Sequence, residues 1–201
     1  MNQQTDTAHD DPFKLFGLWM KEAELAEPDN PNAMILASAD ARGQPGARAV
    51  LCKHWDERGF VFYTNLESRK AREIRENPKV SLLFYWKSLA RQVRIDGIAE
   101  QIPDDEADAY FATRPRGSQL GAWASRQSAE MPNGKADFEQ RLHEVEERFH
   151  GREVPRPPFW SGFRVTPRAI EFWEEQPFRW HDRRLFHRND EGAWTMSWLY
   201  P

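Results

Sequence analysis

The hydrophobic pattern of the chain begins with a helical period. From Pro12, apolar side chains recur at spacings of three and four through FKLFGLWMKEAELAE, which predicts an amphipathic helix with proline in its first turn. The pattern ends before PDNPN, a sequence rich in turn formers. Residues 1–11 are polar and acidic, and we expect them to be disordered.

The next segments show the alternation that is typical of half-buried strands. Five of them come before the second half of the chain, at residues 33–40, 46–55, 59–65, 80–86 and 91–102. The sequence DERG predicts a hairpin turn between the second and third segments. Because the strands follow one another closely, an antiparallel barrel or strongly curved sheet is favoured over a doubly wound α/β fold.

Helical segments interrupt and follow this series. We expect helices at residues 68–77, 104–114 and 135–150, and strands again at 163–175, 182–188 and 193–201. The late strands would complete the same sheet. The pattern therefore predicts a mainly β fold with flanking helices, in which residues 12–201 form a single domain.

Composition and charge narrow the function. The chain has 201 residues and a formal net charge of −4, which argues against nucleic-acid or membrane-surface binding. No segment has the roughly 20 apolar residues that span a bilayer, and no signal-peptide core is visible, so we expect a cytoplasmic protein. Cys52 is the single cysteine and the histidines are scattered, so we expect no disulfide and no metal site.

A cationic cluster nevertheless occurs in NLESRKAREIREN. Ser68 is a good N-cap, and Arg69 and Lys70 then fall in the first helical turn. Cations there oppose the helix dipole, so the cluster indicates either a bound phosphate or a solvated surface helix. Arg48 and Lys53 could reach the same region. Their odd spacing puts them on opposite faces of a regular strand unless a bulge intervenes.

A second cluster repeats polar side chains every four residues. Tyr110, Arg114 and Ser118 would share one face of a continuous helix and could clamp a phosphate. Pro115 disfavours helical geometry at the residue before it, so we expect the helix to break there and Ser118 to begin a new one. Taken alone, this pattern is more typical of a structural role.

The third cluster is FRWHDRR, residues 178–184. In a strand, Arg179, His181 and Arg183 would line one face. Such a row requires an anionic neighbour, or else it belongs to a solvated edge strand. Together the three clusters favour more than one phosphate group, and the many aromatic residues favour flat rings attached to them.

The chain as a whole resembles the pyridoxamine 5′-phosphate oxidase family. The resemblance runs from about Pro12 to the end and rests on RAVLCKHWDERGFVFYTN, SRKAREI, NPKVSLLFYW, RQVRIDG, YFATRPRGSQLGAWASRQS, FWSGFRV and RWHDR. It implies an antiparallel, FMN-binding split β-barrel. It also implies a homodimer with FMN at the interface, so that a second subunit would supply some of the contacts.

The resemblance assigns roles to individual residues. The positions that match the family's FMN-binding residues are Arg48, Lys53, Tyr63, Thr64, Ser68, Arg69, Lys70, Gln92, Gln127, Ser128, Trp173 and Arg183. The positions that match its substrate-phosphate contacts are Lys53, Tyr110, Arg114 and Ser118. Arg179 and His181 match the catalytic residues that lie over the substrate ring.

The implied reaction is the oxidation of pyridoxamine or pyridoxine 5′-phosphate to pyridoxal 5′-phosphate. Hydride would pass from the substrate C4′ to flavin N5, and dioxygen would become hydrogen peroxide. Two alternatives are a related flavin oxidase of the phenazine branch and a non-catalytic module that binds flavin or pyridoxal phosphate. The chain departs from the family in its acidic N-terminal segment and in Trp198, which stands where an arginine is usual.

Overall fold

A computed structural model describes residues 11–201. Of residues 1–11, which we expect to be disordered, residues 1–10 lie outside the described part, whereas Asp11 is described and caps the first helix. The strands are β1 Ala33–Ala39, β2 Pro45–Leu51, β3 His54–Asp56, β4 Gly59–Asn65, β5 Lys79–Trp86, β6 Arg91–Gln101, β7 Trp160–Glu174, β8 Asp182–Arg188 and β9 Trp194–Trp198. The α-helices are α1 Pro12–Ala26, α2 Arg69–Glu76, α3 Asp104–Thr113, α4 Arg116–Ala124 and α5 Lys135–Arg148. Two 3-10 turns are η1 Lys87–Leu89 and η2 Pro177–Arg179. Within this part of the chain, none of the helices is long and apolar enough to cross a membrane.

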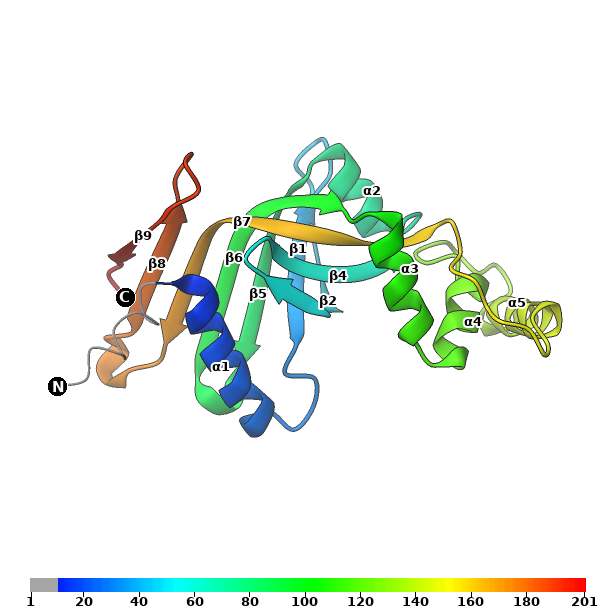
Figure 1. Cartoon of the computed structure of the whole chain (residues 1–201), viewed down its shortest axis with the longest axis horizontal. Coiled ribbons are helices and arrows are strands. Elements are labelled where there is room, and N and C mark those ends of the chain that lie inside the picture. The colour runs from blue at the N-terminus through cyan, green and yellow to red at the C-terminus, as the bar shows by residue number, and fades with distance from the viewer. Residues whose placement is uncertain (1–10) are drawn as a thin grey trace.

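All the strands join one curved antiparallel sheet (Figure 1), which confirms the predicted mainly β fold with flanking helices. The order is β2-β1-β5-β6-β7-β4-β3, and β8 and β9 extend from β7. The long strand β7 pairs with β4 through its first part and with β8 through its last part. The late strands therefore complete the early sheet, as the pattern predicts.

Helix α1 covers one face of the sheet. Asp11 caps it, since its carboxylate accepts a hydrogen bond from the N–H of Phe13 at 2.9 Å. Phe16 is fully buried, and its ring centroid lies 4.9 Å from that of Phe60 and 5.1 Å from that of Phe84. Each fully buried ring of this size contributes ~1.5–3 kcal/mol. The aromatic core therefore fixes the sheet that carries the site.

One predicted strand is wrong, because residues 46–55 do not form a continuous strand. Strand β2 pairs with β1, whereas β3 pairs with β4, and the chain changes partners between Cys52 and Lys53. At this break the N–H of Lys53 donates to the carbonyl of Val61 at 2.8 Å. The alternation rule therefore does not connect Arg48 with Lys53, and both side chains can face one pocket.

The first half of residues 178–184 is also not a strand. Pro177 begins a 3-10 turn, and Phe178 and Arg179 have positive φ angles of 60° and 65°. Strand β8 begins only at Asp182. Proline fixes its own φ and lacks an N–H donor, which suits the start of a turn. Arg179 therefore shares no strand face with β8.

Helices α3, α4 and α5 lie at one end of the molecule, and β8 and β9 lie at the other (Figure 1). Two arginines hold α3 against the segment that leads into β7 and against β7 itself. Arg156 contacts Asp104 at 2.8 Å and Asp108 at 2.5 Å, and Arg164 contacts Glu106 at 2.6 Å. Because these ion pairs anchor α3 near the sheet, they position the helix that carries Tyr110.

Candidate binding and active site

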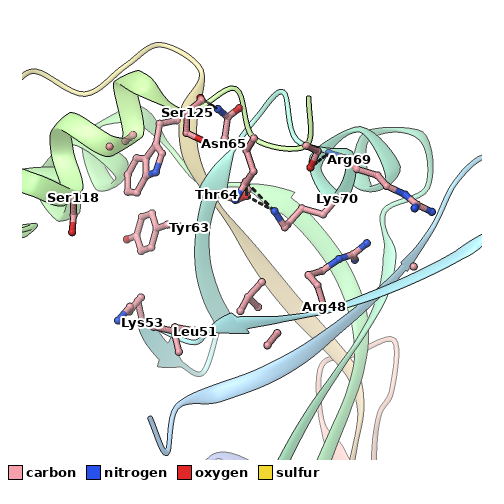
Figure 2. Close-up of a pocket in the computed structure, with 18 of the residues that line it drawn as sticks. Arg48, Leu51, Lys53, Tyr63, Thr64, Asn65, Arg69, Lys70, Ser118 and Ser125 are labelled. Carbon is pink, nitrogen blue, oxygen red and sulfur yellow. Dashed lines mark hydrogen bonds between the residues drawn. The ribbon is translucent and has the colours of Figure 1, made fainter. Parts of the chain in front are cut away.

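A pocket of about 890 Å³ is formed by β2, β4, β7, α2, α3, α4 and the segment after α4 (Figure 2). It gathers most of the predicted site residues, although they are far apart in sequence. The predicted residues that line it are Arg48, Lys53, Tyr63, Thr64, Arg69, Lys70, Tyr110, Arg114, Ser118, Gln127 and Ser128. Arg48 and Lys53 are both among them, because the chain breaks between β2 and β3.

One side of the pocket is the N-terminal end of α2. Ser68 caps the helix as predicted, and its hydroxyl accepts from the N–H of Ala71 at 3.4 Å. Lys70 is buried, and its Nζ donates to Thr64 Oγ1 at 3.1 Å and to Gln127 Oε1 at 3.0 Å. It also donates to the hydroxyl of Ser68 at 3.4 Å. Each of these acceptors is an uncharged oxygen.

The surroundings of Lys70 fit a phosphate group. Burial and the positive charge of Arg48 lower the pKa of Lys70 to about 8, although the carboxylate of Glu73 acts in the opposite direction. A dianion would stabilise the charged form of this lysine. It would also meet the positive end of the α2 helix dipole, which attracts anions. We name Arg48, Ser68, Arg69 and Lys70 the α2 cluster.

Both arginines of the α2 cluster contact one carboxylate, which the sequence analysis missed. Glu73 Oε2 lies 2.8 Å from Arg48 Nη2, and its Oε1 lies 2.7 Å from Arg69 Nε. The spacing of four residues between Arg69 and Glu73 in a predicted helix was an available signal for the second contact. The first contact is tertiary and has no local signal.

The other side of the pocket is aromatic and cationic. Tyr63 stacks on Tyr110 with ring centroids 3.9 Å apart, and on Trp160 with centroids 5.2 Å apart. The Arg114 guanidinium lies 4.8 Å from the centroid of the Trp160 ring. Its Nη1 atom is buried and has no hydrogen-bond partner among residues 11–201. Trp160 lies within the FWSGFRV motif, but no role was predicted for it from the sequence.

Ser118 reaches this side of the pocket from α4. The chain breaks at Pro115 as predicted, but α4 begins at Arg116, so the expectation that Ser118 begins the helix is wrong. Proline fixes its own φ and ends α3, and its carbonyl accepts from the N–H of Ser118 at 2.8 Å. Figure 2 shows Ser118 and Lys53 apart from the α2 cluster.

We name Lys53, Tyr110, Arg114 and Ser118 the α4 cluster. The pocket thus has two polar, cationic regions, the α2 cluster and the α4 cluster, with the ring of Tyr63 beside the second one. Burial of the Arg114 guanidinium lowers its pKa, and the Tyr110 phenol opposes this change. A desolvated guanidinium with an unused donor favours a phosphate or carboxylate ligand. The arrangement suits two anionic groups in one pocket.

The remaining predicted residues lie outside this pocket. We name Gln92, Trp173, Arg179, His181 and Arg183 the C-terminal cluster. Gln92 is opposite Trp173 on neighbouring strands, and Trp173 is opposite Arg183. The His181 ring lies 4.7 Å from that of Trp173. A second group across β6, β7 and the start of β8 is therefore formed by Gln92, Trp173, His181 and Arg183. Arg179 lies exposed in the turn η2 that precedes β8.

The two groups are too far apart for one small ligand within one chain. Tyr63, in the pocket, is opposite Gly162 on β7, whereas Trp173 lies near the other end of that strand. The stretch from Gly162 to Trp173 measures roughly 36 Å along the curved strand at about 3.3 Å per residue. A ligand that contacts both groups requires a second copy of the chain.

The surface around the C-terminal cluster is rich in exposed aromatic side chains. Phe178, Trp180, Trp198 and Tyr200 are all exposed. Aromatic side chains of this kind are enriched at protein interfaces. Trp198, which replaces the expected arginine, lies with its ring 6.0 Å from the guanidinium of Arg184.

Two family models match the chain. "Pyridoxamine 5′-phosphate oxidase" matches residues 20–149, and "Pyridoxine 5′-phosphate oxidase C-terminal dimerisation region" matches residues 160–201. A pyridoxine/pyridoxamine 5′-phosphate oxidase from Rubrobacter xylanophilus is 57% identical over 98% of this chain and 89% of the relative. Another protein of that name, from Azorhizobium caulinodans, is 55% identical over 97% of this chain and 92% of the relative.

Solved structures show the same fold. PhzG from Burkholderia lata, in complex with tetrahydrophenazine-1-carboxylic acid, superposes with a TM-score of 0.90 at 30% identity, covering 100% of this chain and 98% of PhzG. A pyridoxamine 5′-phosphate oxidase-related, FMN-binding protein from Nostoc punctiforme has a TM-score of 0.76 at 17% identity, covering 95% of this chain and 98% of that one. The second match concerns the fold alone.

Proposed function

This chain belongs to the pyridoxamine 5′-phosphate oxidase family, and we propose that it uses FMN to oxidise pyridoxine 5′-phosphate and pyridoxamine 5′-phosphate to pyridoxal 5′-phosphate. Relatives that carry this name align with almost the whole chain. The observation that carries the proposal is the pocket with two separate regions for anions. FMN and the substrate are both phosphate esters of flat ring compounds, so each would use one region.

In this proposal the α2 cluster holds the phosphate of FMN. The buried ammonium of Lys70 meets only uncharged oxygens, and the N-terminal end of α2 adds a favourable helix dipole. Thr64 and Gln127 hold the ammonium in place. Ser128 closes the same end of the pocket, because its hydroxyl accepts from the N–H of Arg69 at 3.2 Å.

The α4 cluster holds the phosphate of the substrate. Arg114 offers its unused Nη1 donor, while the Trp160 ring fixes the plane of its guanidinium. The hydroxyl groups of Tyr110 and Ser118 add neutral donors, and Lys53, which lines the same pocket, adds a second cation that would also contact FMN where its ring meets the substrate. Holding the two esters at separate ends would bring their rings together between the clusters.

The C-terminal cluster would come from the second subunit of a homodimer. Residues 160–201, which match a dimerisation region, include four of its five members. Gln92, Trp173 and Arg183 would contact the flavin. Arg179 and His181 would face the substrate ring. The Nδ1 atom of His181 accepts from the N–H of Gln176 at 3.2 Å, so its Nε2–H can donate to the substrate.

The contribution of this chain to the reaction is positioning. FMN, when bound, supplies the hydride acceptor and passes the electrons on to dioxygen, which becomes hydrogen peroxide. The two clusters fix the phosphates, and the Tyr63 stack gives the pocket a flat wall. Holding two reactants in a reactive arrangement can lower a barrier by about 7–11 kcal/mol. A cytoplasmic location, where both phosphate esters would be available, is part of the same proposal.

The similarity to PhzG favours a second candidate, an oxidase for a ring compound that carries a carboxylate. The higher identity to the relatives named as pyridoxine/pyridoxamine 5′-phosphate oxidases weighs against it. Oxygen uptake and product formation should be measured with pyridoxine 5′-phosphate, unphosphorylated pyridoxine and a reduced phenazine carboxylate, with and without added FMN. We expect FMN-dependent pyridoxal 5′-phosphate formation. Turnover of the phenazine compound alone, or binding without turnover, would contradict the proposal.

A further inference from the structure

The wall behind the α2 cluster contains a buried carboxylate to which the proposed function assigns no role. Glu73 lies on α2, is only 4% exposed and is not among the residues that line the pocket. Its Oε2 accepts from Arg48 Nη2 at 2.8 Å and from the hydroxyl of Ser38 at 2.5 Å, while its Oε1 accepts from Arg69 Nε at 2.7 Å. One carboxylate thereby ties β1, β2 and α2 together.

These contacts orient Arg48 without any ligand. Its Nη1 donates to the carbonyl of Leu36 at 3.2 Å and to the hydroxyl of Ser38 at 2.5 Å, and its Nη2 donates to Glu73. A guanidinium has more N–H donors than these contacts use, so some remain for an anion in the pocket. The protein has therefore fixed the plane of Arg48 before FMN binds, which lowers the entropic cost of binding.

The sequence of β2 is adapted to this ion pair. A Cβ atom at Gly46 would lie 2.7 Å from Arg48 Nη2 and 3.1 Å from Glu73 Oε1. A side chain at this position would push the guanidinium and the carboxylate apart. The absence of a Cβ at Gly46 thus allows the pair to pack tightly against the strand.

The carboxylate is charged when it makes these contacts. Burial opposes ionisation of Glu73, but hydrogen bonds from Ser38, Arg69 and Arg48 outweigh it and hold the pKa of the carboxyl below its ordinary value. Arg48, Arg69 and Lys70 carry one positive charge each, and Glu73 removes one, so the net charge of the group is +2. A phosphate monoester carries about −1.5 to −2 near pH 7. The group therefore matches a dianion closely.

We propose that Glu73 is a positioning residue for FMN: it holds Arg48 and Arg69 in the orientation in which they receive the phosphate. This inference rests on the proposed function, because it requires FMN at the α2 cluster. A simpler electrostatic role for Glu73 would change FMN binding in the opposite direction. A carboxylate that only competed with the phosphate for the two arginines would weaken FMN binding, and its removal would strengthen binding. The sign of the change separates the two roles.

The test is equilibrium titration of the FMN-free protein with FMN and, in parallel, with riboflavin, which lacks the phosphate. Glu73→Gln keeps the shape of the side chain and removes its charge, so we expect FMN affinity to fall about tenfold or more. Riboflavin affinity should stay the same. Glu67→Gln is the matched control, because Glu67 lies beside the same helix end and its side chain is exposed. We expect the control to change FMN affinity less than about twofold.

A neutral second variant protects the test against misfolding of the first. Ser38→Ala removes the hydroxyl that joins Arg48 to Glu73 and changes no charge. We expect it to weaken FMN binding several-fold and to leave riboflavin binding unchanged. Tighter or unchanged FMN binding in Glu73→Gln, equal losses for both flavins, an equal loss in Glu67→Gln, or unchanged FMN binding in Ser38→Ala would each overturn the inference. Failure of the unaltered protein to bind FMN would instead refute the proposed function.

Discussion

Substitution of Arg114 tests where the substrate phosphate binds. Its guanidinium lies 4.8 Å from the Trp160 ring centroid, and its buried Nη1 has no hydrogen-bond partner within residues 11–201. The burial that lowers its pKa also removes the water that would otherwise solvate the charge. Arg114→Met keeps an unbranched apolar chain over Trp160 and removes both the charge and the donors.

The size of the effect follows from the contact that would be lost. A hydrogen bond to a charged group contributes ~1.5–3 kcal/mol, and about 1.4 kcal/mol corresponds to a factor of ten. We therefore expect kcat/KM for pyridoxine 5′-phosphate to fall about 10- to 150-fold. Because burial has already removed water from this guanidinium in the free protein, little further desolvation opposes the contact, which places the loss toward the upper end of that range. Most of it should appear in KM, because the phosphate contact is the same in the ground state and the transition state.

The assay compares initial rates of product formation at saturating FMN for pyridoxine 5′-phosphate and for unphosphorylated pyridoxine. Arg114→Met should lower the preference for the phosphate ester by the same factor and leave FMN affinity unchanged. Arg116→Met is the control, because that guanidinium donates to the carbonyls of Phe149 and Arg152 outside the pocket. It should leave the preference intact. An unchanged preference in Arg114→Met, or a loss of FMN binding, would refute the assignment of the α4 cluster.

Three further predictions concern other parts of the molecule. A bound phosphate favours the charged form of Lys70, whose pKa in the free protein is about 8, so FMN affinity should fall as the pH rises through 8. FMN titrations across this pH range should show the fall in the unaltered protein and a smaller fall in Lys70→Arg. An FMN affinity that does not change with pH would contradict the role of this lysine. Trp160→Leu removes the ring that stacks with Tyr63, and we expect urea unfolding to show that the free energy of unfolding falls by about 2–4 kcal/mol. An unchanged free energy of unfolding would show that the stack does not stabilise the protein. Burial raises the pKa of the Cys52 thiol to about 12, so a thiol reagent should react slowly with the folded protein and rapidly with the protein unfolded in urea. Fast reaction of the folded protein would show that this part of the core opens.

Local signals in the sequence were sufficient to predict where α1 and α2 begin. Ser68 is the N-cap of α2, as predicted, and α1 begins at the predicted Pro12. These predictions succeeded because capping and helical periodicity depend on residues within one or two turns. The antiparallel sheet was also predictable, since its early strands are neighbours along the chain.

Features that depend on partners distant in sequence were not predictable. The break at Lys53 exists because β2 pairs with β1 while β3 pairs with β4. The residues near the break give no local signal of this change of partner. Glu73 gains its role from Ser38 and Arg48, which lie on two other strands. The turn at Pro177 could have been predicted, because proline is a local signal for a turn, but the strand prediction for residues 178–184 rested on alternation alone.

The proposed reaction is tested most directly by the absorbance of the flavin in the FMN-loaded protein after anaerobic addition of pyridoxine 5′-phosphate. We expect the visible flavin band to bleach in a single turnover, with pyridoxal 5′-phosphate formed in equal amount, and to return when oxygen is admitted. A flavin spectrum that stays oxidised while the substrate binds would contradict the proposed reaction.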